Sequence, residues 1–170
     1  MKQQKKRLHV RQRSVSEADK SKAKKGGRRV EKYDNEMCLT FQAKSCNEAL
    51  ARMTVAAFLT PLNPTLTELA DIKTAVSEAV TNAIIHGYGE EGGVVELWCA
   101  RKEREVFFHI KDTGKGIADI AAAMEPMYTT KPELERSGMG FSFMEAFTDE
   151  LIVESTVGEG TVIKMRKVIG

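Results

Sequence analysis

The sequence has few cysteines and no long apolar run, and each shortage limits what the chain can be. Its three cysteines, Cys38, Cys46 and Cys99, are far apart and show no C-x-x-C or metal-ligand spacing. This odd, scattered set favours a reducing cytoplasm and ordinary packing roles. No apolar stretch approaches the roughly 20 residues that span a bilayer, and no apolar segment follows the basic N-terminus. We therefore expect a cytoplasmic protein with neither a secretory signal nor a membrane partner.

The length of 170 residues suits one domain with a proper core. The net charge of +2 hides an uneven distribution. Residues 1–32 carry thirteen Lys or Arg against three Asp or Glu, whereas the rest of the chain carries thirteen against twenty-one. Because the remaining 138 residues are acidic, we do not expect direct binding to nucleic acid by the folded part.

Residues 1–32 form a basic extension with almost no large apolar side chains. Such a segment cannot bury enough surface to offset its chain entropy, so we expect it to be disordered. A basic tail that touches nucleic acid or anionic lipid is a second reading. In a third, the codons for Lys-Gly-Gly before Val30 can contain a ribosome-binding sequence, so that Val30 is the true start and the tail is a mis-assigned leader. Residues 33–170 are expected to form a single folded domain.

The hydrophobic pattern predicts an α+β fold. Alternation predicts strands at 36–43, 94–102 and 105–112 and a closing hairpin around Gly158 and Gly160. Capping-box patterns at Ser45–Glu48 and Thr65–Glu68 open two predicted helices, the first ending near Leu59 and the second near Gly87. A third helix is expected over "MGFSFMEAFTD". This order of strands and helices predicts a two-layer sandwich, with helices on one face of a mixed, mostly antiparallel sheet.

Glu78 and Asn82 are the first candidate site residues. They lie four positions apart on the second long helix, so they share one face. An amide oxygen suits Mg²⁺, and a carboxylate beside it can accept a proton. A solvated helix face is the alternative reading. Small neighbours such as Ala75, Ala79 and Ala83 leave room for a ligand.

Two glycine motifs provide the other candidates. "DTGKGI" follows a strand, and its Gly114 and Gly116 allow a sharp turn close to a flat ligand, where Asp112 can accept from an exocyclic amine. "RSGMGFS" opens a helix, whose free N–H groups suit an anion. Either motif alone also fits an ordinary turn or helix entry. Together they bracket a loop with Thr130, Lys131 and Arg136, which is what phosphoryl transfer requires.

Taken together, these three motifs resemble those of the histidine kinase/gyrase/Hsp90-type ATPases. More narrowly, "MTVAAFLTPLNPTLTELADIKTAVSEAVTNAIIHGY" and "YTTKPELERSGMGFSFMEAF" closely resemble the anti-sigma F factor family of spore-forming bacteria. The resemblance extends over roughly residues 34–165. The basic extension is the one clear departure from it.

The resemblance implies a role for each matching residue. Glu78 would be the general base, Asn82 the Mg²⁺ ligand, Asp112 the adenine-reading carboxylate and Arg136 a charge-stabilising catalytic residue. Other nucleotide contacts would come from Gly114, Gly116, Thr130, Lys131, Ser137, Gly138, Met139, Gly140 and Thr161.

The function that the resemblance implies is a kinase and an inhibitor in one chain. It would sequester sporulation sigma factor F and use Mg-ATP to phosphorylate an anti-anti-sigma factor on serine, and a homodimer is expected. A non-catalytic, nucleotide-gated sigma-binding module is the alternative. Arg52 on the first helix is the candidate partner contact, although the sequence alone favours a solvated arginine. His86 and His109 fit structural roles better than phosphoacceptor roles.

Overall fold

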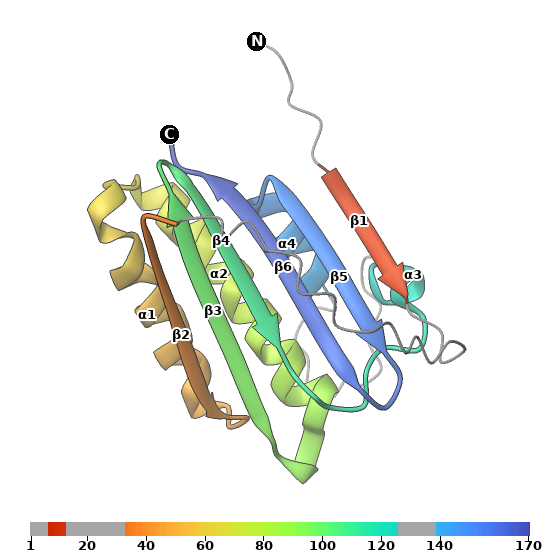
Figure 1. Ribbon diagram of the computed structural model, residues 1–170. Helices are drawn as coiled ribbons and strands as arrows, with labels where there is room; N and C mark the ends of the chain where they lie inside the picture. Colours follow the sequence, from red (N-terminus) through yellow and green to blue (C-terminus); the bar gives the residue numbers. More distant parts are fainter. Residues whose placement is uncertain (1–6, 13–32, 126–138) are drawn as a thin grey trace, which may run out of the picture.

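The structure is a computed structural model that describes residues 7–12, 33–125 and 139–170. It is a two-layer α/β sandwich, as expected (Figure 1). One six-stranded sheet has the order β1-β5-β6-β4-β3-β2. The strands are β1 (Arg7–Gln12), β2 (Asn35–Gln42), β3 (Val94–Lys102), β4 (Glu105–Lys111), β5 (Glu150–Thr156) and β6 (Gly160–Val168). Every neighbouring pair is antiparallel except β1–β5.

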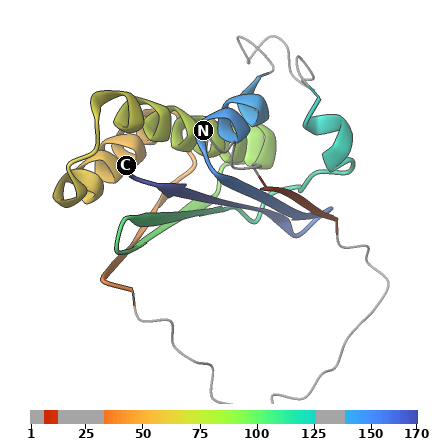
Figure 2. The same ribbon diagram turned by 90° about the horizontal axis from the view of Figure 1, so that it is seen from above.

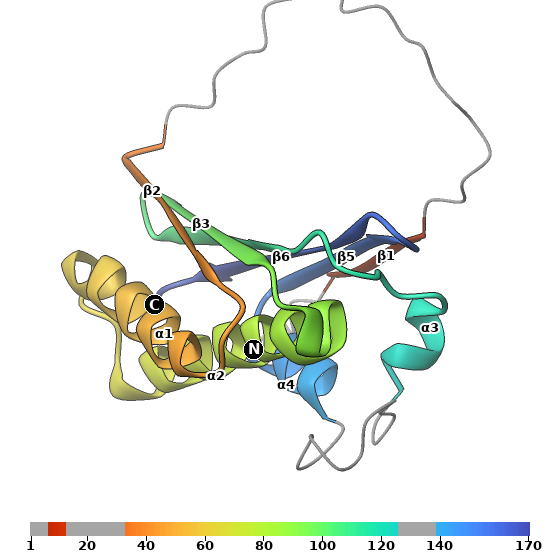
Figure 3. The ribbon, with the colours of Figure 1, turned by 90° about the horizontal axis from the view of Figure 1, so that it is seen from below.

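The helices all cover the same face of the sheet (Figures 2 and 3). The layer contains α1 (Cys46–Leu59), α2 (Leu66–Asn82), α3 (Ile120–Ala123) and α4 (Gly140–Phe147). Short 3₁₀ turns, η1 (Thr60–Leu62) and η3 (Gly89–Glu91), follow α1 and precede β3, and a π-helical turn, η2 (Ala83–Tyr88), extends α2. Among the described residues, no helix is both long and apolar enough to span a membrane.

The core lies between the helical layer and the inner face of the sheet. Apolar side chains from both layers are fully or almost fully buried there: Ala51, Val55, Val76, Val80, Leu97, Phe108, Leu151 and Ile163. Their spacing follows the helical period in α1 and α2 and alternation in the strands, as the sequence predicts. Cys99 belongs to this core, and burial raises the pKa of its thiol to about 12, in agreement with a packing role.

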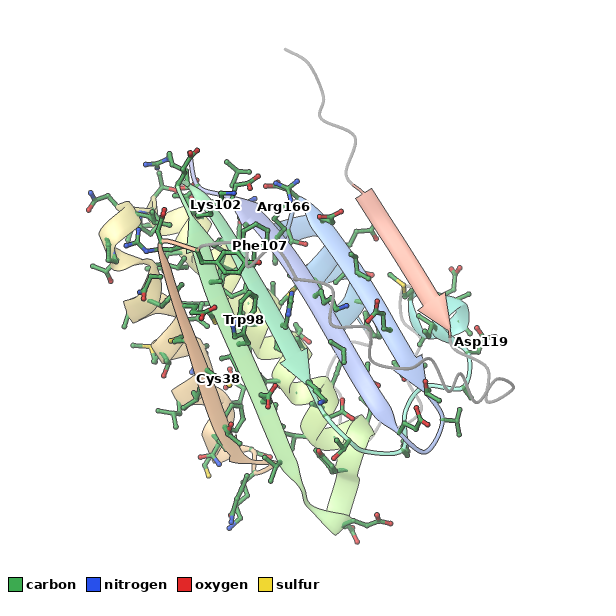
Figure 4. The ribbon with its side chains drawn as sticks, in the orientation of Figure 1. Cys38, Trp98, Lys102, Phe107, Asp119 and Arg166 are labelled. Atoms are coloured by element: carbon green, nitrogen blue, oxygen red, sulfur yellow. The ribbon has the colours of Figure 1, made fainter. Side chains whose placement is uncertain are left out.

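Within the described ranges, the opposite face of the sheet carries no helix, and it has its own side-chain cluster. Trp98, Phe107 and Arg166 lie over this open face (Figure 4). The Trp98 and His109 rings pack with centroids 4.5 Å apart. Burial lowers the pKa of His109, assisted by Lys164 and opposed by Glu154. A neutral imidazole packed against a tryptophan ring in a strand is consistent with the structural role expected for His109.

Strand β1 is a departure from the sequence-based expectation. Arg7–Gln12 lies within the extension expected to be disordered, but it pairs in parallel with β5, from Arg7 opposite Glu150 to Gln12 opposite Ser155. The physical reason is that β5 would otherwise be an edge strand with unpaired backbone groups, and "RLHVRQ" alternates well enough to pair with it. Residues 1–6 and 13–32 lie outside the described residues.

Only one of the two expected capping boxes forms. Thr65 caps α2 in the full reciprocal pattern: its hydroxyl accepts from Glu68 N–H, and its own N–H donates to the Glu68 carboxylate over 2.8 Å. Ser45, by contrast, already has helical dihedral angles and makes no side-chain cap bond, so this prediction was wrong. Glu48 N–H bonds to the Ser45 carbonyl instead, and the Glu48 carboxylate accepts from Ser77 over 2.6 Å.

This contrast gives a paired prediction. Thr65→Ala should lower the free energy of unfolding by about 1 kcal/mol, because it leaves helical N–H groups without a partner. Ser45→Ala should stay within about 0.5 kcal/mol of the unmodified protein, because no cap bond is lost. Urea unfolding followed by circular dichroism measures both. Equal losses in the two variants would contradict the assigned caps.

Candidate functional site

Glu78 and Asn82 face the start of α4, which packs against α2. Gly140 opens α4, and a Cβ atom placed on it would lie 3.0 Å from Glu78 Oε2 and 3.4 Å from Asn82 Oδ1. A side chain at position 140 would thus crowd both polar groups. The expected helix pair and the expected Gly-x-Gly turn therefore meet at one place, although Asn82 and Gly140 lie 58 positions apart in the sequence.

The far end of the same helix meets the glycine loop that follows β4. The π-helical turn η2 places Gly87 against Gly114, where a Cβ on Gly114 would lie only 2.2 Å from the Gly87 carbonyl oxygen. Lys115 N–H donates to that carbonyl over 2.9 Å. A π-turn widens the helix, and such turns are frequent at functional sites. The second long helix was expected to end near Gly87, and η2 ends at Tyr88.

Asp112 sits at the end of β4 with its carboxylate buried beside Gly87. Its Oδ1 accepts from Gly114 N–H at 2.9 Å and from Thr161 N–H at 3.3 Å. Burial raises the pKa of this carboxyl, and the two backbone N–H groups partly oppose that rise. In the part of the chain that the structure describes, both donors lie on Oδ1, so Oδ2 keeps its lone pairs for another partner.

The hairpin between β5 and β6 forms a third side of the site. Gly160 has a φ of 102°, and a Cβ there would lie 2.2 Å from the Asp112 carbonyl oxygen. Gly116 has a φ of 71° and approaches the Thr156 carbonyl equally closely. These close contacts bring the loop after β4 and the Thr161 side chain together.

A cavity of about 450 Å³ opens where these segments meet. This volume lies in the range of ordinary small-ligand pockets. Its wall combines a few polar groups with apolar ones, from the end of α2, the loop after β4, α3, α4 and β6. The lining residues are Asn82, Ala83, His86, Gly87, Asp112, Lys115, Gly116, Ile117, Ala118, Asp119, Ala123, Gly140, Phe141, Val157, Thr161 and Ile163.

The structure thus brings together the described part of the expected site. Asn82, Asp112, Gly116, Gly140 and Thr161 line the cavity. Glu78, Gly114 and Met139 belong to the same region, at α2, the loop after β4 and the N-cap of α4. The other expected contacts lie outside the described residues: Thr130, Lys131, Arg136, Ser137 and Gly138.

Arg52 lies on α1, among none of the residues that line the cavity. Its Nε is 3.2 Å from Glu48 Oε1, and its side chain is 43% exposed. Leu50 and Met53, on either side of it in the sequence, are 51% and 57% exposed. The helix therefore presents a mixed apolar and basic surface to solvent.

The cavity also includes residues that the sequence analysis did not assign to the site. His86 and Gly87 lie one turn beyond Asn82, and Lys115 and Ile117 lie within the glycine motif. The helical spacing from Asn82 to His86 could have identified the histidine. Gly87 could not be found in this way, because its role depends on a contact with Gly114, 27 positions away.

The oxygen atoms of Asn82 and Glu78 suit a hard cation that takes most of its ligands from water and phosphate rather than from the protein. In the described ranges no three His, Cys, Asp or Glu side chains cluster to hold a metal by themselves. Asn82 offers one neutral oxygen beside the Glu78 carboxylate, in a recess that a Cβ on Gly140 would fill. Mg²⁺ accepts such a site because it keeps several waters and phosphate oxygens as ligands.

Comparison with known proteins agrees with this geometry. The histidine kinase-like ATPase domain matches residues 41–167. The anti-sigma F factor of Clostridium kluyveri (strain ATCC 8527) is 56% identical over 136 residues, which cover 80% of this chain and 96% of that protein. The anti-sigma F factor of Geobacillus kaustophilus (strain HTA426) is 55% identical over 134 residues, covering 78% and 92%.

A solved structure shares the fold. It is described as the crystal structure of the RsbU and RsbW domains of Rv1364c from Mycobacterium tuberculosis, and it superposes with a TM-score of 0.57 at 19% identity. The match covers 79% of this chain and 32% of that one, so the chain spans about a third of the solved protein. At this identity the likeness concerns the fold alone.

The raised pKa of Asp112 predicts a pH-dependent cost in the nucleotide-free protein. A carboxyl whose folded pKa exceeds its unfolded pKa stabilises the fold below the unfolded pKa and loses that contribution as the pH rises through the folded pKa. Asp112→Asn removes the buried charge and still accepts from Gly114 N–H. Its Tm should therefore equal or exceed that of the unmodified protein at pH 7, and the difference should shrink towards pH 4.

Thermal denaturation without nucleotide at several pH values tests this. Glu159→Gln, at an exposed turn, is the control and should show no such trend. A Tm for Asp112→Asn that falls well below the unmodified value at pH 7 would mean that the carboxylate stabilises the apo fold.

Proposed function

Because the chain belongs to the anti-sigma F factor family of histidine kinase-like ATPase domains, we propose that it is a serine kinase as well as an anti-sigma factor. The proposed substrates are ATP and a serine of an anti-anti-sigma factor, and the proposed inhibited partner is sporulation sigma factor F. The observation that carries the proposal is the meeting of Glu78 and Asn82 with Gly140, at the wall of a cavity that also contains Asp112.

The nucleotide would lie along this cavity with its base near the sheet. Asp112 and Thr161 would read the adenine, with Gly114 and Gly116 beside it. Asn82 would hold Mg²⁺, and Met139 and Gly140 would lie along the phosphates at the N-terminus of α4, where the helix dipole favours an anion. Roles for Thr130, Lys131, Arg136, Ser137 and Gly138 remain predictions from the sequence.

For phosphoryl transfer, the protein mainly has to position the reactants and supply a general base. ATP, when bound, supplies the phosphoryl group that is transferred. Glu78 accepts the proton of the incoming serine hydroxyl, and its place on α2 fixes it because the neighbouring Ala79 and Val80 are fully buried. The apolar part of the cavity wall, which includes Ile117, Phe141 and Ile163, excludes water from the reaction site.

A second candidate is a non-catalytic module that binds nucleotide and sigma factor without transferring phosphate. The position of Glu78 favours the kinase, since a site that only holds nucleotide needs no carboxylate facing its metal ligand. A repulsive carboxylate beside the phosphates would weaken binding without any compensating use.

The partner surface is proposed to lie on α1. Arg52 is half-exposed between the exposed Leu50 and Met53, and interfaces are enriched in arginine and apolar anchors of this kind. A homodimer and a cytoplasmic location are proposed on the family resemblance alone.

The kinase is tested by transfer of labelled phosphate from ATP to a purified anti-anti-sigma factor in the presence of Mg²⁺. Glu78→Gln should reduce transfer by about a hundredfold or more, because general-base catalysis contributes that much. Its Kd for ADP should stay within about threefold of the unmodified protein, since the neutral isostere keeps the shape of the site.

Glu96→Gln is the matched control, because Glu96 is an exposed carboxylate on β3. It should transfer phosphate at the normal rate. If the unmodified protein binds ATP tightly but labels no serine, the non-catalytic module is the correct function.

Arg52→Ala should weaken binding to the sigma factor by about tenfold or more, as truncation of a central arginine does in other interfaces. Its affinity for ADP should not change, because Arg52 is not among the residues that line the cavity. Lys111→Ala removes an exposed cation from the sheet and is the control. Isothermal titration with purified sigma factor measures all three proteins, and equal affinities would remove Arg52 from the interface.

A further inference from the structure

Ser155 is a buried polar residue that none of the proposed roles uses. It lies on β5, is 4% exposed, and is absent from the residues that line the cavity. Its hydroxyl nevertheless makes three hydrogen bonds, each to a segment of the candidate site. Ile117 N–H donates to Ser155 Oγ over 2.8 Å, Ser155 donates to the Gly160 carbonyl over 3.0 Å, and Ser155 Oγ lies 2.9 Å from Thr161 Oγ1.

Counting protons settles the direction of the bond between the two hydroxyl groups. A serine hydroxyl has one proton and two lone pairs. The Gly160 carbonyl can only accept, so the Ser155 proton is used there. Thr161 must then donate its own proton to Ser155 Oγ. The Thr161 oxygen, which lines the cavity, keeps only acceptor capacity towards a ligand.

Thr161 and its neighbour Asp112 both present hydrogen-bond acceptors to the cavity. Asp112 also lines the cavity and offers lone pairs on Oδ2, because its backbone donors both lie on Oδ1. Two acceptors at one end of a pocket suit a ligand group that donates two hydrogen bonds, such as the exocyclic amine of an aminopurine. They are unfavourable to a carbonyl oxygen at the same position, which would face lone pairs and leave buried acceptors unpaired.

We propose that Ser155 is a positioning residue that fixes the Thr161 hydroxyl as a hydrogen-bond acceptor, so that the base site takes an aminopurine and rejects an oxopurine. This inference rests on the proposed nucleotide site. Ser155 is absent from the residues that line the cavity, and it acts through the direction of one hydrogen bond. Removing its hydroxyl frees the Thr161 proton, and the threonine can then donate to a carbonyl.

The test is the ratio of the Kd for inosine diphosphate to the Kd for ADP, measured by isothermal titration with Mg²⁺. In Ser155→Ala this ratio should fall by about three- to tenfold relative to the unmodified protein, which is the range of one hydrogen bond. Ser155→Thr keeps the hydroxyl and should keep the original ratio. An unchanged ratio in Ser155→Ala would overturn the inference.

A double-variant experiment separates this role from a merely structural one. In a Thr161→Val background, adding Ser155→Ala should leave the ratio unchanged, because there is no hydroxyl left to orient. A further fall there would show that Ser155 does not act through Thr161. Thr148→Val is the control for a lost buried hydroxyl, since Thr148 bonds to the Met144 carbonyl and does not line the cavity; it should not move the ratio.

Two outcomes distinguish failure of this inference from failure of the proposed function. If the unmodified protein binds ADP and Ser155→Ala keeps its selectivity, only the role of Ser155 is wrong. If the unmodified protein binds neither nucleotide, the proposed site itself is wrong and the inference falls with it. Should Ser155→Ala fail to fold, Ser155→Cys preserves the volume and weakens the same bonds, and its ratio should fall in the same direction.

Discussion

The backbone of Gly114 packs against the carbonyl group of Gly87, and Lys115 N–H donates to that carbonyl over 2.9 Å. This contact joins the helix that carries Glu78 and Asn82 to the strand end that carries Asp112. It leaves no room for a Cβ on Gly114, because the nearest backbone atom would be 2.2 Å away. Without so close an approach, Asn82 at the proposed metal site and Asp112 at the proposed adenine site would lie on separate elements, and nothing would fix their spacing.

The same contact has an unfavourable effect on the free energy of folding when no nucleotide is bound. Closing the helix end onto the loop buries the Asp112 carboxylate, and this burial raises its pKa against the effect of two backbone N–H groups. A buried acceptor with free lone pairs is unfavourable until a donor arrives. A ligand amine would satisfy Asp112, so binding would recover free energy that the folded apo protein forgoes. Such local conflicts are expected where a fold serves binding rather than stability.

The sequence predicts those parts of the structure that local signals determine. The Thr65 capping box and the apolar spacing of α2 lie within one segment, and the structure agrees with both. The Ser45 box failed because Glu48 bonds instead with Ser77, 29 positions away, an interaction that no local pattern encodes. Gly87 and Ser155 were missed for the same reason. Their contacts join backbone and hydroxyl groups of distant segments, whereas Asp112 and Asn82, which line the cavity, were predicted from motifs with recognisable side-chain chemistry.

Ser77 and Glu78 are consecutive on α2 but face different neighbours. Ser77 donates to Glu48 on α1, which in turn pairs with Arg52, whereas Glu78 faces Gly140 at the start of α4. The proposed partner surface and the proposed catalytic base therefore lie beside different neighbours of α2. A standard interface of about 800 Å² per partner is wide enough to cover α1 and still deliver a serine to Glu78. If the anti-anti-sigma factor also contacts α1, it would compete with the sigma factor for that helix, and only a partner that presents a serine to Glu78 would be phosphorylated.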